Sequence, residues 1–234
     1  MCGRYVVKTE PEEFENTLGE PVVDGQDAAP QARYNAAHSQ KLPVVVRQQD
    51  GQLYFRHFQW GLIPHWADDP KIAYKMINAR AESVFEKAAY KHAARRSRCL
   101  VPMHGFFEWQ KQDAKTKQPF FIHPAGEQLW MAAGLYSRWQ SPEGELRFTF
   151  TIMTTDANEA LQPYHHRMPV LFPHRSAARH WIDPQAAEDQ LRELLQPLPD
   201  DAVGAYPVST EVNTPSSDHA GLLAPIGRQG GLFG

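Results

Sequence analysis

The chain begins Met-Cys-Gly-Arg-Tyr, and Cys2 has a chemical property that an internal cysteine lacks. Once Met1 is removed, Cys2 carries a free α-amine with an ordinary pKa of roughly 7.7–8 beside a thiol with an ordinary pKa of roughly 8.5. The amine of such a residue attacks an aldehyde to give a Schiff base, and the thiol then closes a five-membered thiazolidine ring. The first residues of the sequence therefore predict a nucleophile that captures aldehydes.

A cysteine at position 2 is by itself more often inert or structural, but three later segments favour the chemical interpretation. In each, a polar side chain of catalytic type lies among apolar neighbours, at residues 33–37, 105–109 and 165–170. These segments supply an amide, a carboxyl and an imidazole, from Asn35, Glu108 and His165 or His166. Together with Cys2 they form a candidate catalytic set.

Glu108 lies between Phe107 and Trp109 in a predicted strand, so its side chain should face away from both aromatic neighbours. Apolar walls disfavour the charged form of a carboxyl and raise its pKa, as a general acid that works near neutral pH requires. A surface glutamate on a half-exposed strand fits the same segment equally well, and the segment alone leaves both interpretations open.

His165 and His166 are adjacent, and in an extended backbone their rings point to opposite sides. The pair is therefore not expected to bind one metal ion, and one of the two should face the site, where an imidazole moves protons near neutral pH. Arg167 beside them has the planar guanidinium that clamps a phosphate. A hydrogen-bonded core histidine is the alternative for either ring.

Asn35 has an amide that could hold the amine or the carbonyl of Cys2 in place, although an asparagine at this position could also simply form a turn. Trp66, close to Pro64, could stack on a nucleic-acid base, whereas most tryptophans belong to the core. Under the nucleic-acid interpretation, phosphate contacts would come from three guanidinium groups, those of Arg4, Arg80 and Arg167.

The composition limits the classes of protein that fit. With 234 residues, 42% of them hydrophobic, the chain suits one large domain, and no stretch approaches the roughly 18 apolar residues of a membrane span. Two cysteines without a CxxC pair exclude a disulfide framework, and we expect no metal, no cofactor and a cytoplasmic location. A net charge of -3 argues against coating of nucleic acid by bulk charge, but residues 87–98 hold five basic residues and no acid.

Hydrophobic alternation and turn residues predict a β-rich chain. Strands are expected at residues 3–7, a hairpin at 42–46 and 53–60, a series of strands between 99 and 154, and further strands at 168–172 and from 206. Helices are expected at 9–18, 82–96, shortly after 156, at 174–182 and at 184–195. In the helix at 82–96, a stripe of Lys87, Lys91 and Arg95 would face one side. Residues 1–226 are predicted to form one domain and residues 227–234 a mobile Gly-rich tail.

Seven short segments, in one order along the chain, together resemble the SRAP (SOS response-associated peptidase) family. They are Cys2-Gly3-Arg4, Arg33-Tyr34-Asn35, residues 60–64, 77–82, 98–102 and 105–109, and His165-His166-Arg167-Met168-Pro169. The resemblance implies an α+β fold, a single domain with a mixed, antiparallel β-barrel-like sheet core and flanking helices. It also implies crosslinking of Cys2 to abasic sites in single-stranded DNA, with lyase activity and removal of the protein's own Met1. We expect a monomer.

By motif position, the resemblance assigns the orientation of Cys2 to Asn35, proton transfer to Glu108, and stabilisation and protonation of the Schiff base to His165. The chain departs from the family pattern at His38 and at Met103-His104. Other functions remain open. A Met-Cys-Gly start also occurs in amidotransferases with an N-terminal cysteine, a Cys/His/Asn set resembles that of cysteine peptidases, and a binding module for single-stranded DNA would need no catalytic Cys2.

Overall fold

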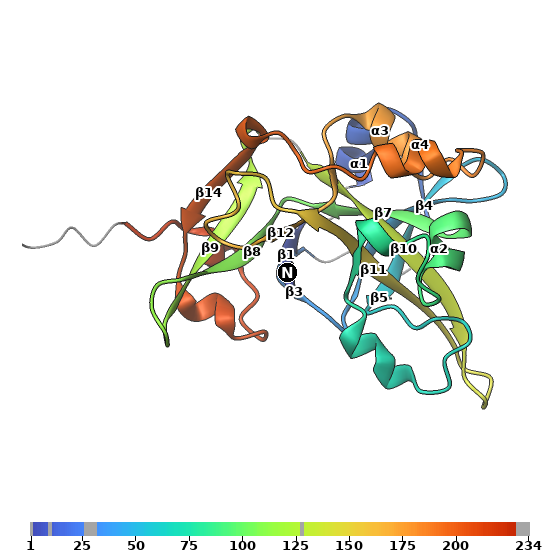
Figure 1. The fold of residues 1–234 in the computed structure, drawn as a ribbon, viewed down its shortest axis with the longest axis horizontal. Coiled ribbons are helices and arrows are strands. Elements are labelled where there is room, and N and C mark those ends of the chain that lie inside the picture. Colours follow the sequence, from blue (N-terminus) through green and yellow to red (C-terminus); the bar gives the residue numbers. More distant parts are fainter. Residues whose placement is uncertain (1, 9–10, 26–31, 127–128, 228–234) are drawn as a thin grey trace, which may run out of the picture.

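Two β-sheets form the centre of the protein in a computed structural model that describes residues 2–8, 11–25, 32–126 and 129–227 (Figure 1). The smaller sheet has five strands and contains the first strand of the chain in an inner position. In spatial order its strands are β14 (Val203–Pro207), β9 (Lys117–Pro124), β8 (Gly105–Lys111), β1 (Arg4–Val7) and β3 (Arg33–Ala37).

The larger sheet curls until it closes on itself. Its order is β12 (Arg167–Pro169), β11 (Leu146–Asp156), β10 (Trp130–Gln140), β7 (Arg98–Met103), β4 (Lys41–Arg47), β5 (Leu53–Trp60) and β2 (Val22–Asp24). Because β11 also pairs with β5, the strands β11, β10, β7, β4 and β5 form a closed ring. The β-barrel-like sheet predicted from the sequence is therefore confirmed.

Two short strands complete the larger sheet. β6 (Asn78–Arg80) runs parallel to β11, and β13 (Leu171–Phe172) runs antiparallel to β10. The predicted strand at 168–172 is thus divided into β12 and β13, because Val170 between them donates a hydrogen bond to Met153 and accepts one from Ala133. The parallel pairs β11–β5, β11–β6 and β2–β5 make the sheet mixed, as expected.

Alternation along the strands divides the core into two parts. One cluster contains inward-facing residues from all five strands of the ring and extends to Cys2 and Tyr5 in the smaller sheet. The other contains the opposite faces of the same strands, such as Val45 and Leu100, packed against the helices. The ring therefore holds the start of the chain on one side and the helices on the other.

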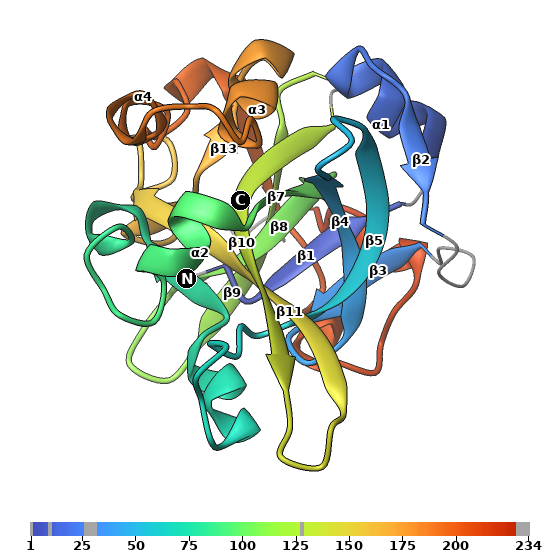
Figure 2. The ribbon, with the colours of Figure 1, turned by 90° about the vertical axis from the view of Figure 1, so that its right-hand side faces the viewer.

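The helices are short and cover the outer face of the ring. They are α1 (Pro11–Leu18), α2 (Lys91–Arg96), α3 (Arg175–Trp181) and α4 (Glu188–Glu193), and Figure 2 shows α1, α3 and α4 gathered along one edge. Trp181 anchors α3, since its indole nitrogen lies 3.1 Å from the carbonyl oxygen of Cys99. The described residues also form five 3-10 turns: η1 (Pro70–Lys75), η2 (Ala81–Ser83), η3 (Asp200–Ala202), η4 (Thr210–Asn213) and η5 (Ala220–Leu223).

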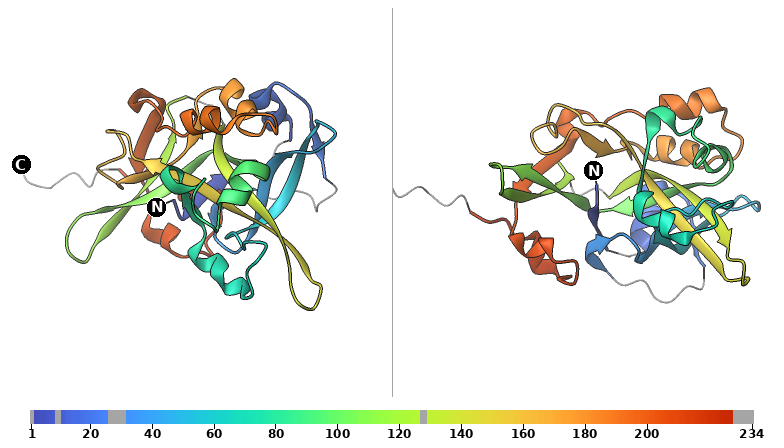
Figure 3. Two further views of the ribbon diagram at one scale, coloured as in Figure 1. Left: turned by 45° about the vertical axis from the view of Figure 1, so that its right-hand side comes forward. Right: turned by 60° about the horizontal axis from the view of Figure 1, so that its bottom comes forward.

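The predicted hairpin at 42–46 and 53–60 is confirmed, with Arg47 opposite Leu53 and Gly51 in the turn at a φ of 80°. Left-handed backbone of this kind favours glycine. In Figure 3 the β8–β9 and β10–β11 hairpins extend to opposite sides of β1.

Two helix predictions are wrong. Residues 82–96 form η2, a series of turns and only the short α2, and turns replace the helix expected after 156. In a continuous helix Phe85 and Tyr90 would point about 140° apart, yet both are buried in one core cluster. Lys87 consequently precedes the helix, and Arg95 forms an ion pair with Glu188, so the predicted cation stripe is absent from the described surface.

Residues 228–234 and Met1 lie outside the described residues, so the predicted tail and the state of the first residue remain predictions. Within the described residues, no helix is long and apolar enough to cross a membrane.

Candidate active site

Cys2 lies immediately before β1 and is fully buried between the two sheets. The smaller sheet holds β1 on both sides, with Tyr5 opposite Phe106 of β8 and Ala36 of β3. Gly105, which pairs with Val6 of β1, also allows β8 to approach β9 closely, because a Cβ at that position would lie 2.4 Å from the carbonyl oxygen of Ile122. The reactive end of the chain is therefore fixed by strand pairing rather than left as a free terminus.

Asn78 is the residue that holds the backbone of Cys2. Its side-chain nitrogen donates a hydrogen bond to the carbonyl oxygen of Cys2 at 2.9 Å. Asn78 belongs to β6, which lies opposite Ile152 of β11 in the larger sheet. Its Oδ1 atom is buried and accepts no hydrogen bond from any described residue. This oxygen is thus an unused acceptor beside the predicted nucleophile.

Sequence reasoning missed Asn78, although it quoted the segment that contains it. The sequence feature that could have identified Asn78 was an asparagine in residues 77–82, directly after a long irregular loop and two residues before Arg80. Only the parallel pairing of β6 with β11 brings Asn78 to Cys2, and this contact spans 76 positions.

Asn35, which the sequence assigned to the orientation of Cys2, makes its side-chain hydrogen bonds elsewhere in the described protein. It is fully buried in β3, and its amide nitrogen donates to the carbonyl oxygens of Val212, Thr214 and Ser217 at 3.2, 3.1 and 2.8 Å. Its oxygen accepts a hydrogen bond from Arg4 at 2.9 Å. Asn35 therefore joins β1 and β3 to residues 212–217, and the expected direct contact with Cys2 is replaced by that of Asn78.

Glu108 is buried, with 5% of its surface exposed, and the interpretation as a surface glutamate is wrong. Phe107 and Trp109 pack in a separate cluster, whereas Phe106 packs in the cluster that contains Cys2. Glu108, two residues after Phe106, therefore lies on the Cys2 side of β8, as strand alternation predicted. Burial raises the pKa of the Glu108 carboxyl.

The carboxyl of Glu108 affects the pKa of the Cys2 thiol. Burial raises the pKa of the Cys2 thiol far above its ordinary value, and the negative charge of Glu108 raises it further. The backbone oxygen of Arg4, at 4.0 Å, is the one hydrogen-bond acceptor near the thiol among the described residues. The raised pKa values favour the protonated form of each group, so the carboxyl near the nucleophile is suited to act as an acid.

His165 lies in a loop that covers the same face of β8. The ring of Tyr164 is centred 4.6 Å from that of Phe120, which is the cross-strand partner of Glu108. Gln110, also on β8, donates a hydrogen bond to the carbonyl oxygen of Pro163 at 3.4 Å. The loop that carries His165 is thus held against the strand that carries Glu108.

The rings of His165 and His166 do not point to opposite sides. Their centres are 4.3 Å apart and the rings are stacked, because the chain bends here and is not extended. The Nδ1 atom of His165 accepts a hydrogen bond from the backbone N–H of Arg167 at 2.9 Å, so its proton is on Nε2. Burial, with a contribution from His166, lowers the pKa of His165 to about 4. The imidazole is therefore neutral near pH 7.

The arginines that were predicted to contact phosphate differ in whether their guanidinium groups are already bound to other residues of the protein. Arg167 is 6% exposed and forms ion pairs with Glu82 at 2.7 Å and Asp156 at 2.6 Å. Arg4 is half-buried and donates to Asn35 and to the carbonyl oxygen of Val212. The guanidinium of Arg167 is therefore already paired with carboxylates and is not free to bind a phosphate.

Arg80 and Trp66 are exposed, Trp66 to 51%, and Arg80 forms no ion pair with a described residue. Among the four side chains predicted to contact DNA, these two are directly available to a ligand. In the described parts of the chain, no three His, Cys, Asp or Glu side chains are grouped as metal ligands.

Comparison with known proteins gives consistent matches. Residues 1–215 match the family described as SOS response associated peptidase (SRAP). The abasic site processing protein YoqW of Bacillus subtilis (strain 168) is 37% identical over 226 residues, covering 95% of this chain and 99% of YoqW. The abasic site processing protein HMCES of Gallus gallus is 34% identical over 224 residues, covering 82% of this chain and 66% of HMCES.

The fold also matches a solved structure. The crystal structure of a protein from Bacteroides thetaiotaomicron superposes with a TM-score of 0.85 at 24% identity, over 96% of this chain and 100% of that chain. The two proteins share their fold.

Proposed function

Because the chain belongs to the SOS response associated peptidase (SRAP) family, we propose that it processes abasic sites in DNA by covalent capture through Cys2. The observation that carries this proposal is a buried Cys2 held by Asn78 beside the buried carboxyl of Glu108. The relatives YoqW and HMCES are named abasic site processing proteins, and the ring-opened sugar of an abasic site carries the aldehyde that a 1,2-aminothiol captures.

The reaction begins after removal of Met1, which we assign to the protein itself. The α-amine of Cys2 adds to the C1′ aldehyde of the sugar, and loss of water from the carbinolamine leaves a Schiff base. The sulfur of Cys2 then bonds to the same carbon while the thiol proton passes to nitrogen, which closes the thiazolidine. In the Schiff-base state, loss of a proton from C2′ and departure of the 3′ phosphate would give the lyase reaction.

Three side chains have separate tasks in this scheme. Glu108, with its raised pKa, donates a proton to the carbinolamine hydroxyl so that water leaves, and returns protons when the ring reopens. His165 is neutral and carries its proton on Nε2, so it donates a hydrogen bond through Nε2 to the sugar hydroxyl released by ring opening. Asn78 fixes the Cys2 carbonyl and offers its free oxygen to the amine. Asn35 supports the site indirectly through Arg4.

The DNA contacts follow from exposure. Trp66 stacks on a base and Arg80 contacts a phosphate, since both are exposed. Arg4 and Arg167 reach a phosphate only if it displaces a present partner, for example the exposed carboxylate of Asp156 from Arg167. An abasic sugar in a single strand is not held within a base-paired helix, so it reaches a buried nucleophile more easily than an abasic sugar in a duplex. Single-stranded DNA is therefore the substrate. We expect a cytoplasmic monomer.

The test is a crosslinking assay with a single-stranded oligonucleotide that carries one abasic site. The wild-type protein should give a shifted band on a denaturing gel, and intact mass should show that the free protein has lost Met1. Cys2→Ala should give no band, and Cys99→Ala, which removes the other buried cysteine, should retain it. No band from a protein with a confirmed free Cys2 amine would refute the proposal and favour an amidotransferase, a peptidase or a simple binding module.

A further inference from the structure

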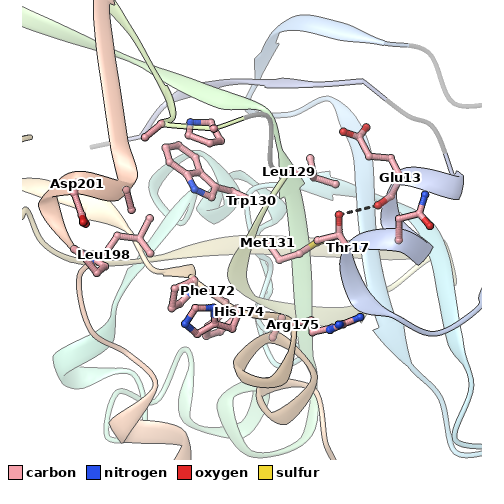
Figure 4. A pocket seen from close by; sticks show the side chains of 18 of the residues that line it. Glu13, Thr17, Leu129, Trp130, Met131, Phe172, His174, Arg175, Leu198 and Asp201 are labelled. Carbon is pink, nitrogen blue, oxygen red and sulfur yellow. Dashed lines mark hydrogen bonds between the residues drawn. The ribbon is translucent and has the colours of Figure 1, made fainter.

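A cavity with a volume of about 1050 Å³ lies on the helix-covered side of the protein (Figure 4). Its walls come from α1, β10, β13, α3 and the segment at residues 198–202. None of Cys2, Asn78, Glu108 and His165 lines it. Ligand pockets in proteins typically measure roughly 300–1000 Å³, so this cavity has room for several side chains of a ligand and is separate from the site around Cys2.

The floor of the cavity is apolar. It consists of five side chains that are almost fully buried, Leu129, Trp130, Met131, Phe172 and Leu198. Trp130 is 5% exposed, and its indole N–H donates no hydrogen bond to a described residue. In Figure 4 this nitrogen points toward the cavity. The floor therefore offers an apolar surface with one hydrogen-bond donor.

The rim carries more negative than positive charge. Three carboxylates line it, from Glu12, Glu13 and Asp201, against one guanidinium and one imidazole. The Glu13 carboxylate lies 3.0 Å from Nε2 of His104, a residue at which the sequence departs from its family pattern. Glu12 and Asp201 are exposed and form no ion pair within the described residues.

The guanidinium of Arg175 does not neutralise the carboxylates of this rim, because it lies near the C-terminal end of α1. In Figure 4 it extends away from the floor toward that helix, and a Cβ on Gly19 would lie 2.7 Å from its Nη1. The last turn of α1 contains no basic residue, so Arg175 supplies the positive charge that the end of a helix favours. The exposed carboxylates of Glu12 and Asp201 are left for a cationic ligand.

We propose that this cavity is a docking site for a short segment of a partner protein in which apolar residues are flanked by lysine or arginine. The apolar side chains cover the floor, a backbone carbonyl of the segment accepts the hydrogen bond from Trp130, and the flanking cations pair with Glu12 and Asp201. DNA is excluded by its charge. The protein can therefore bind such a partner and its DNA substrate at the same time.

The first experiment measures the binding of three dye-labelled hexapeptides to the full chain by fluorescence anisotropy. The sequences are Lys-Lys-Leu-Phe-Lys-Lys, Lys-Lys-Ser-Ser-Lys-Lys and Glu-Glu-Leu-Phe-Glu-Glu, each acetylated and amidated. The first should bind at least tenfold more tightly than either of the others. Equal binding of both basic peptides would show attraction by bulk charge only, and preference for the acidic peptide would reverse the assigned polarity; either result overturns the proposal.

The second experiment locates the bound peptide with charge reversals of equal size. Glu12→Lys combined with Asp201→Lys should weaken binding of the Leu-Phe peptide at least tenfold. Asp189→Lys combined with Glu193→Lys makes the same change of charge on exposed positions of α4, outside the cavity, and should leave binding unaltered. Equal weakening by the two pairs would overturn the proposal. Crosslinking to abasic DNA serves as a check that all four substitutions leave the fold intact.

Discussion

The side chain of Asn78 and the backbone of Cys2 are joined by a hydrogen bond of 2.9 Å that connects the two sheets. The strand that carries Asn78 belongs to the larger sheet, whereas Cys2 lies two residues before β1, a strand of the smaller sheet. The position of the nucleophile therefore depends on the packing of the sheets as well as on the order of the first strand.

Replacement of Asn78 by alanine should slow capture of an abasic site about fivefold, because loss of a hydrogen bond of roughly 1 kcal/mol leaves Cys2 less well oriented. The rate of crosslink formation in single-turnover gels measures this effect. Asn35→Ala is the matched control. It should lower the melting temperature, since Arg4 and buried carbonyl groups lose their partner, at a cost of about 1–3 kcal/mol. A capture rate that falls more in Asn35→Ala than in Asn78→Ala would return the orienting role to Asn35.

Glu108→Gln should change how stability depends on pH. The pKa of Glu108 is raised in the folded protein, so its contribution to stability is complete below the ordinary glutamate pKa and is lost as the pH rises through the folded value. The variant has no such loss and should gain in melting temperature relative to wild type as the pH rises above 4.5, the ordinary glutamate pKa. The crosslinking rate of Glu108→Gln should also be lower than that of wild type. Glu193→Gln, on the surface, should show neither change, and a pH-independent difference for Glu108→Gln would contradict the buried carboxyl.

His165 should titrate near pH 4, as followed by the ring-proton resonances in NMR spectra, whereas an unperturbed histidine titrates near 6.5. Since its pKa is lowered on folding, the stability that it contributes is present above about pH 6.5 and is lost as the pH falls toward 4. Wild type should therefore lose melting temperature relative to His165→Gln across this range. A resonance with a midpoint near 6.5 would show that the ring is solvated and not held by the N–H of Arg167.

Tyr5→Phe should stabilise the protein by about 1 kcal/mol, because the Tyr5 hydroxyl is buried without a hydrogen bond to any described residue. The ring itself packs edge-on against Trp60 at 5.2 Å and is retained in phenylalanine. Tyr206→Phe provides the comparison, since its hydroxyl donates to the carbonyl oxygen of Leu223 at 2.9 Å and its loss should cost about 1 kcal/mol. Denaturant unfolding of both variants measures the two changes, and equal destabilisation would mean that Tyr5 has a partner in solution.

The sequence alone predicted those parts of the site that depend on short-range patterns. Alternation along 105–111 placed Glu108 on the side opposite to Phe107 and Trp109, and the turn at Gly51 set the register of the hairpin. These features require only neighbours in the chain, so a local pattern was sufficient to find them.

Long-range contacts could not be predicted in the same way. Arg167 has the type and setting of a phosphate ligand, but the carboxylates of Glu82 and Asp156 reach it through strand pairings that no local pattern reveals. The stacking of His165 on His166 depends on a bend that follows six turn residues, 159–164, where strand alternation does not apply. The residues 82–90 have helical composition, and tertiary packing of Phe85 and Tyr90 prevents the helix.

The inner position of β1 affects the order in which the protein can be assembled during translation. One neighbour, β3, follows soon after β1, but β8 begins at Gly105, and roughly 100 more residues must be synthesised before it can pair with the first strand. At about 5–20 residues per second, the N-terminus stays outside a finished sheet for about 5–20 s. During this interval the ribosome-bound chain presents its first two residues to the solvent, so maturation of the N-terminus has a time window that closes when β8 arrives.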